Sequence, residues 1–223
     1  MFEINNKEYT SYEICGSTVY EIKDFYKYPD EVIKLINNIS PNWHKEKEMG
    51  LGISLNGQKF YDLRHENVIH GIKKVTNFLS NICKQDIHFK KNMFATNIFK
   101  FIDPSFNKCE DNYWWPHNDA GYTALVYLNE QTFPGTNLYT RLCENESGTE
   151  HSTPWQPKSN YILEHNLEAE YNKLVFFDGK NLCHSMSVTD NLFCDIIRCN
   201  QVFFFSESKK LEKISSVFFG QKS

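Results

Sequence analysis

Residues 114–119 read Trp114-Trp115-Pro116-His117-Asn118-Asp119, and the fold is inferred outward from this stretch. Side chains of an extended segment alternate between two faces, so His117 and Asp119 point to the same side. An imidazole and a carboxylate on one face supply two of the three protein ligands of a mononuclear metal centre. Composition alone would supply a His-x-Asp pair in roughly one chain in three, so the surrounding sequence has to support the interpretation.

The sequence after residue 90 contains short β-type runs separated by turn signals. These runs lie at residues 94–102, 123–128, 136–139, 174–177, 184–188 and 196–205. Several short strands with this spacing predict a β-sandwich or β-barrel. We therefore expect an α+β fold whose β-rich core spans about residues 91–208.

The first 90 residues mix strand and helix signals. Residues 18–25 are typical of a strand, and Pro29-Asp30 can open a helix because proline suits the first turn and the acid faces the helix dipole. Apolar residues at helical spacing predict a second helix over residues 66–83, and turn residues over 50–64 predict a loop or hairpin. We expect this N-terminal part, about residues 1–90, to pack its helices on the sheet.

Length and composition favour one compact domain over residues 1–223. A hydrophobic content of 40% with 18 phenylalanines is enough for a large core. The net charge of −4 and the lack of a basic patch disfavour nucleic acid as a partner. No apolar run predicts a signal peptide or a membrane span. The seven cysteines form no Cys-x-x-Cys pair, which favours a reducing, cytoplasmic location.

A metal centre needs a third ligand, and His184 is the best candidate. It begins a predicted strand after the apolar run 174–177 and the turn Asp178-Gly179, so a β-sandwich could bring it to the His-x-Asp pair. The other histidines lie in helical, charged or loop segments. His44 and Glu46 form a rival His-x-carboxylate pair, but they sit in an exposed charge run without a strand signal.

Arg198 is the second decisive residue. It lies within the apolar run 195–205, which has the composition of a core strand, and it shares one strand face with Asn200. A buried guanidinium requires an anionic partner, and its planar fork matches a carboxylate. That partner is either Asp195 or another acid of the chain, or the distal carboxylate of a bound oxo acid. We assign Arg198 and Asn200 to a candidate cofactor-binding surface.

Two further features flank the candidate site. Trp114 and Trp115 border the first ligand and could form a substrate wall, although tryptophan in a β-rich protein is more often core. The polar stretch 141–160 predicts a long surface loop, which is either a lid or an incidental insertion.

Taken in order, these motifs resemble the Fe(II)/2-oxoglutarate-dependent oxygenases, particularly their prolyl-hydroxylase-like branch. The matching elements are His117-x-Asp119, Tyr127-Leu128-Asn129, Pro134-Gly135-Thr136, His184 and Arg198. The runs 20–26 and 60–64 also resemble a little-characterised subgroup of these proteins, which extends the likeness over most of the chain. The resemblance implies a double-stranded β-helix, the jelly-roll or cupin-like core.

The same resemblance implies the chemistry. His117, Asp119 and His184 would bind Fe(II) and act as the catalytic centre, while Arg198 and Tyr127 would hold the 5-carboxylate of 2-oxoglutarate. With O2, the co-substrate would be converted to succinate and CO2 while a C–H bond is hydroxylated. Halogenases of this family replace the carboxylate ligand with a small residue, so Asp119 favours hydroxylation. The substrate would be a peptidyl residue, an amino acid or a small metabolite.

Two alternatives come from other classes of protein. The chain could be a non-catalytic jelly-roll protein that binds metal or ligand without turnover, which measurement of 2-oxoglutarate conversion would reveal. It could also be a cupin-like metalloprotein that uses no oxo acid, in which case replacing Arg198 would leave its activity intact.

Overall fold

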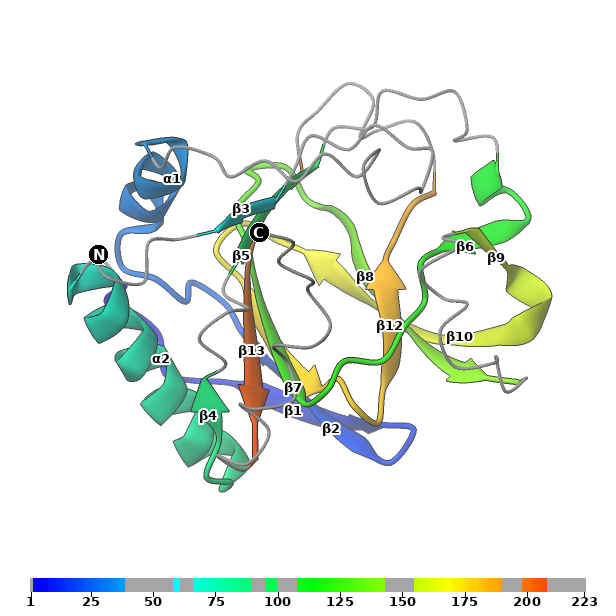
Figure 1. The fold of residues 1–223 in the computed structure, drawn as a ribbon, viewed down its shortest axis with the longest axis horizontal. Coiled ribbons are helices and arrows are strands. Elements are labelled where there is room, and N and C mark those ends of the chain that lie inside the picture. The colour runs from blue at the N-terminus through cyan, green and yellow to red at the C-terminus, as the bar shows by residue number, and fades with distance from the viewer. Residues whose placement is uncertain are drawn as a thin grey trace, which may run out of the picture.

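A computed structural model describes residues 2–38, 58–60, 66–89, 95–99, 108–142, 155–189 and 198–207. Within these ranges the protein is mostly β-strand, with two α-helices and a short 3-10 helix, η4 (Lys158–Asn160). Figure 1 shows the strands grouped at the centre of the molecule and the helices to one side. Among the described residues, no helix has the length and apolar composition needed to cross a membrane.

The larger sheet is antiparallel and has the strand order β1-β2-β11-β7-β13-β5-β3, with β4 paired to β13. Its strands are β1 (Thr10–Ile14), β2 (Ser17–Ile22), β3 (Gln58–Phe60), β4 (His88–Phe89), β5 (Ala95–Phe99), β7 (Tyr122–Tyr127), β11 (Leu174–Asp178) and β13 (Arg198–Ser206). The chain thus returns to this sheet from both its N-terminal and C-terminal parts. Strands β7 and β13, which the site uses, lie in its middle.

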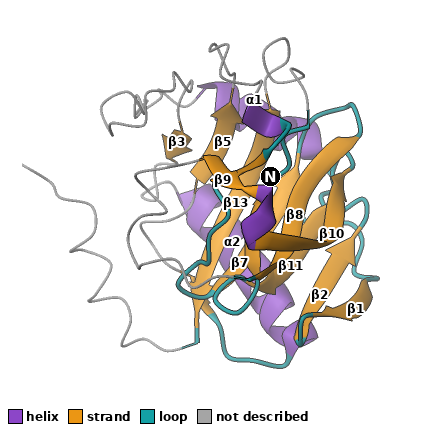
Figure 2. Ribbon diagram, turned by 90° about the vertical axis from the view of Figure 1, so that its right-hand side faces the viewer, coloured by secondary structure: helices purple, strands orange, loops and turns teal. Residues whose placement is uncertain are grey.

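A smaller antiparallel sheet faces the larger one. It consists of β10 (Tyr161–Ala169), β8 (Phe133–Arg141) and β12 (Cys183–Met186), in that order. A separate pair, β6 (Asn112–Trp114) and β9 (Trp155–Pro157), lies beside it. Figures 1 and 2 both show the larger sheet between the smaller sheet and helix α2.

Alternation along β7 assigns the two faces of the larger sheet. Leu125 and Tyr127 belong to the apolar cluster that also contains Leu138 of the smaller sheet, so they face inward between the sheets. Ala124 and Val126 belong to the cluster that contains the helices, so they face outward. The inner face therefore holds whatever site lies between the sheets.

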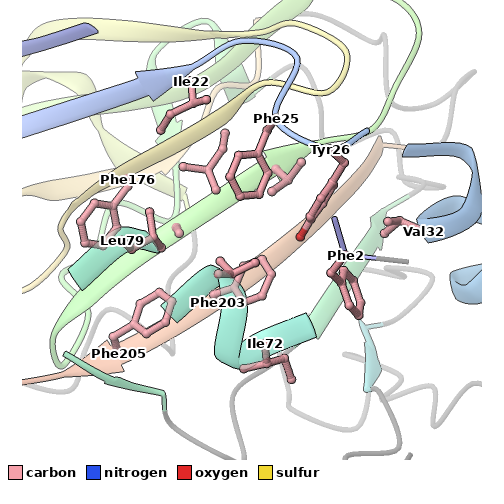
Figure 3. Packing of buried hydrophobic residues seen from close by; sticks show 14 of the residues in the cluster. Phe2, Ile22, Phe25, Tyr26, Val32, Ile72, Leu79, Phe176, Phe203 and Phe205 are labelled. Carbon is pink, nitrogen blue, oxygen red and sulfur yellow. The ribbon is translucent and has the colours of Figure 1, made fainter. Parts of the chain in front are cut away.

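The outer face is covered by α1 (Pro29–Asn38) and α2 (Glu66–Cys83). Helix α2 buries an apolar stripe at helical spacing, formed by Val68, Ile72, Val75 and Leu79. Figure 3 shows Ile72 and Leu79 packed near Phe203 and Phe205 of β13. Gly71 allows Phe2 to lie against this helix, because a β-carbon at Gly71 would fall 1.9 Å from Cδ2 of Phe2.

The elements predicted from the sequence are largely confirmed. Both helices begin where proline and the apolar period placed them, and the six β-type runs correspond to β5, β7, β8, β11, β12 and β13. The prediction of a continuous loop over residues 141–160 is wrong at its C-terminal end, where β9 and η4 form. Residues 143–154 of that stretch lie outside the described residues, as do most of residues 50–64.

Candidate metal centre

Two segments that are distant in sequence bring the predicted ligands together. His117 and Asp119 lie in the connection between β6 and β7, and His184 lies on β12. His117 and His184 form an isolated antiparallel bridge in which each backbone N–H donates to the other's carbonyl, with both N···O distances 2.9 Å. These backbone hydrogen bonds alone therefore fix the distance between the two segments that carry the imidazoles.

Both imidazoles are held by the same local contact. Nδ1 of His117 lies 2.7 Å from the carbonyl oxygen of Trp115, and Nδ1 of His184 lies 2.9 Å from that of Leu182. A carbonyl only accepts, so each Nδ1 carries the proton in these bonds, and Nε2 of the neutral ring keeps its lone pair. A backbone partner on the second nitrogen is the usual arrangement of metal-binding histidines.

Asp119 lies between the two Nε2 atoms. Its Oδ1 is 3.7 Å from Nε2 of His117, and its Oδ2 is 3.1 Å from Nε2 of His184. The three side chains can offer one ligand atom each, all within 4.8 Å of one another. The metal cluster predicted from the sequence is therefore assembled, and we use this name for His117, Asp119 and His184.

Asp119 is held in place by two residues, Thr123 and Gly179, whose contacts with it were not predicted from the sequence. The hydroxyl of Thr123 donates to Oδ2 of Asp119, and the backbone N–H of Asp119 donates to the carbonyl of Gly179 at 2.8 Å. A β-carbon at Gly179 would lie 2.5 Å from the Thr123 hydroxyl and 3.0 Å from Cβ of Asp119. Glycine is required here because the turn before β12 packs directly against the carboxylate.

The electrostatics of the cluster favour a cation. Burial acts to raise the pKa of Asp119, but the imidazoles of His184 and His117 and the Thr123 hydroxyl outweigh it and lower this pKa to about 2. Burial acts to lower the pKa of His184, yet the neighbouring carboxylate of Asp119 holds this pKa above its ordinary value. A carboxylate that stays ionised at neutral pH, with two imidazole nitrogens beside it, is a ready ligand set for a divalent metal.

The residues of the inner face beside the cluster are not fully buried. Met186 and Phe204 face inward by strand alternation, and both are only partly buried, as are His117 and Asp119. Deeper residues of the same face, such as Leu125 and Leu138, are buried. The described part of the inner face is therefore partly exposed beside the cluster and buried further from it.

Arg198 lies in the buried part of the same inner face. Its side chain is buried, with 3% exposure, and its contact is a long hydrogen bond of 3.4 Å from Nη2 to the carbonyl of Gly135. Burial lowers its pKa to about 10, and no carboxylate of the described residues pairs with it. Asp195, the chain's own candidate partner, lies outside the described residues. A buried guanidinium in this state fits an anionic ligand.

Neutral polar groups surround the guanidinium. The Tyr127 hydroxyl is 2.7 Å from Oγ1 of Thr136, and both residues are buried. Asn200 lies opposite Tyr127 on β13 with no exposure, and neither its Nδ2 nor its Oδ1 has a partner among the described residues. An amide buried in this way needs polar atoms from a ligand or from water. Thr136 was part of a matching motif, but its contact with Tyr127 was not predicted.

The two tryptophans differ in position. Trp114 is 5% exposed and belongs to the core between the sheets, whereas Trp115 is partly exposed. Trp115 has a φ of 48°, which is uncommon for a bulky residue, and its carbonyl is the one that holds His117. A role of either ring in substrate binding stays a prediction. The rival pair His44 and Glu46 lies outside the described residues.

Comparisons with known proteins add little to these observations. No protein-family model matches the chain, and no curated protein matches it. The solved structures include an oxidoreductase of the 2OG-Fe(II) oxygenase family from Burkholderia pseudomallei, which is 11% identical. The match covers 85% of this chain and 84% of that chain with a TM-score of 0.49. A likeness at this level carries no weight for function, which has to be inferred from the side chains of the present chain.

Proposed function

We propose that the protein is an Fe(II)- and 2-oxoglutarate-dependent dioxygenase that hydroxylates a C–H bond. The observation that supports this proposal best is the buried guanidinium of Arg198 on the inner face of the larger sheet, the face whose Thr123 hydroxyl bonds the metal cluster. A metal cluster alone suits several kinds of metalloprotein. A metal cluster combined with a buried cation that pairs with no carboxylate of the described residues suits a co-substrate that binds both.

The metal cluster has the donor set of the proposed metal. Two imidazole nitrogens and one carboxylate form the facial triad of non-haem Fe(II) oxygenases, in which the remaining coordination positions are open to ligands. His117, Asp119 and His184 would hold the ion. The chemistry supplied by bound Fe(II) is oxidative decarboxylation of 2-oxoglutarate by O2, giving succinate and CO2, coupled to hydroxylation of the substrate.

The spacing along the smaller sheet suits a five-carbon dicarboxylate. His184 pairs with Leu138, and Met186 pairs with Thr136, one inward-facing position further along. Two residues along a strand correspond to about 6.6 Å. Arg198 contacts Gly135, which precedes Thr136. The guanidinium therefore lies about 6.6 Å, or two residues along the strand, beyond the metal cluster. In the proposal one end of 2-oxoglutarate binds the metal while the other reaches Arg198.

The side chains of the chain have distinct tasks in this scheme. Arg198 neutralises the distal carboxylate, and Tyr127 and Asn200 offer hydrogen bonds beside it. The apolar inner faces of the two sheets exclude water around the reacting atoms. Thr123 orients Asp119 so that its carboxylate keeps one direction toward the metal.

We also propose a fold, a substrate class and a cellular location. The two facing sheets would be a double-stranded β-helix of the prolyl-hydroxylase-like branch, within a single domain. The substrate would be a peptidyl residue, an amino acid or a small metabolite, and nucleic acid is disfavoured by the net charge of −4. The five described cysteines are free thiols, in keeping with a reducing cytoplasm, where iron stays ferrous.

The proposal is tested by loading the protein with Fe(II) without oxygen, adding 2-oxoglutarate, admitting air and measuring succinate. We expect slow succinate formation without substrate and faster formation when a screened metabolite or peptide is hydroxylated. Variants His184→Ala and Arg198→Met should each lose this activity. If the protein binds metal and 2-oxoglutarate but forms no succinate with any member of the panel, it is a binding protein and not an enzyme.

A further inference from the structure

Three consecutive phenylalanines of β13 face in alternate directions. Phe203 and Phe205 lie in the outer cluster beneath the helices and have no exposure. Phe204 lies on the inner face, opposite Thr123 of β7. Side chains that are directly opposite in an antiparallel pair have β-carbons about 4.5–5.5 Å apart. Because the Thr123 hydroxyl donates to Asp119, the ring of Phe204 lies close to the metal cluster.

The exposure of Phe204 is unusual for its place in the sheet. Strand β13 lies in the middle of the larger sheet, between β7 and β5, and Val202 on the same face is 3% exposed. Phe204 is nevertheless only partly buried. A phenyl ring on the inner face of a central strand reaches solvent only where the facing layer leaves space. Phe204 therefore lies in the partly exposed part of the inner face, beside the metal cluster.

The remaining inner-face surroundings of this position are apolar. Val202 of the same strand pairs with Leu125 of β7, and Phe177 packs edge-on against His184 with ring centroids 4.9 Å apart. The cation of Arg198 lies at the far end of β13, six residues from Phe204. A substrate group that enters beside the metal from this side meets hydrocarbon and not a charge.

We propose that Phe204 is a specificity-determining residue, which forms the wall against which an apolar carbon of the substrate is held at the metal. This inference rests on the proposed function, because it assumes a metal in the cluster. The group to be oxidised is then an aliphatic or aromatic C–H, and the charged parts of the substrate stay away from this wall.

The first experiment tests the position of the ring without any substrate. 4-Fluorophenylalanine is placed singly at positions 203, 204 and 205, and fluorine NMR spectra of the Zn(II)-loaded and Co(II)-loaded proteins are compared. We expect the paramagnetic shift and broadening from Co(II) to be largest at 204. An effect at 203 or 205 as large as that at 204 would show that the ring of Phe204 does not border the metal.

The second experiment tests the apolar wall with fluorobenzene as the probe, in the presence of 2-oxoglutarate. Bound near Co(II), fluorobenzene should show faster fluorine relaxation than in the Zn(II) protein. We expect Phe204→Asp to reduce this Co(II)-dependent relaxation about tenfold and Phe204→Leu to retain most of it. Leu163→Asp, at an apolar residue with 45% exposure on β10, is the matched control and should change nothing.

The outcomes separate this inference from the proposed function. Binding of Co(II) is followed independently by its visible absorption. If Co(II) binds and fluorobenzene relaxation is the same in Phe204→Asp and the unmodified protein, the wall is placed wrongly while the metal centre stands. If the unmodified protein binds no Co(II), the metal centre itself is refuted, and the role of Phe204 with it.

Discussion

Replacement of Arg198 by methionine should stabilise the protein and abolish its use of 2-oxoglutarate. The guanidinium is buried, and burial lowers its pKa to about 10, well below its ordinary value, which corresponds to about 3 kcal/mol of unfavourable free energy for the charged form. Methionine keeps an apolar stem of similar length and removes the charge. Allowing for the lost hydrogen bond to Gly135, we expect the free energy of unfolding to rise by about 1–3 kcal/mol.

The same change should weaken co-substrate binding. A hydrogen-bonded contact to a charged group contributes about 1.5–3 kcal/mol, so the dissociation constant of 2-oxoglutarate should rise about 10- to 100-fold. Urea unfolding with Co(II) present, with and without 2-oxoglutarate, measures both effects. At 100 times its dissociation constant a ligand adds about 2.7 kcal/mol, and the variant should lose most of this increment.

Arg141→Met is the matched control, because Arg141 lies at the end of β8 and contacts Asn118 and Cys183. It should leave the affinity for 2-oxoglutarate unchanged. The reasoning is refuted if Arg198→Met lowers the free energy of unfolding by several kcal/mol while 2-oxoglutarate binds as before. That result would mean that the guanidinium is paired with a carboxylate of the chain, such as Asp195.

Three further predictions concern the support of the metal cluster. Thr123→Val removes the hydroxyl that donates to Asp119 and should weaken metal binding about 10- to 100-fold by titration calorimetry, whereas Thr76→Val on α2 should not. Gly179→Ala places a methyl group 2.5 Å from the Thr123 hydroxyl and should abolish tight metal binding while leaving the protein folded by circular dichroism. In the metal-free protein, Asp119 has a lowered pKa, so its stabilising contribution is present above its ordinary pKa of 3.8 and is lost as pH falls toward about 2. His184 has a raised pKa, so its contribution to stability is present below pH 6.5 and is lost at higher pH. The unfolding free energy of the unmodified protein minus that of Asp119→Asn, measured from pH 2 to 9, should therefore be largest between about pH 4 and 6.5. A difference that does not change with pH would count against the pair.

The site residues that could be predicted from the sequence are those marked by their spacing along a strand or by a charge within an apolar run. Alternation along an extended segment was enough to place His117 and Asp119 on one side, and an arginine among phenylalanines was enough to mark position 198. These signals are local, since they depend on strand period and on the cost of burying charge. They can be recognised in the sequence without knowledge of how the strands pair.

Residues whose role depends on packing between distant segments could not be found in this way. Thr123 and Gly179 support Asp119 only because β7 and the turn before β12 lie side by side, and threonine or glycine at such positions is ordinary in sequence. Strand β10 was missed because residues 162–165 are exposed and its pairing with β8 contains register shifts, which weaken the alternating pattern. Only burial distinguished Trp114 from Trp115.

The most direct test of the metal centre is equilibrium binding of Fe(II) under anaerobic conditions. We expect one Fe(II) per chain in the unmodified protein and loss of tight binding in His117→Ala, Asp119→Ala and His184→Ala. His165→Ala, which removes an exposed histidine of β10 that lies outside the cluster, should bind like the unmodified protein. Equal Fe(II) affinity in the three cluster variants and in His165→Ala would contradict the assignment of the centre.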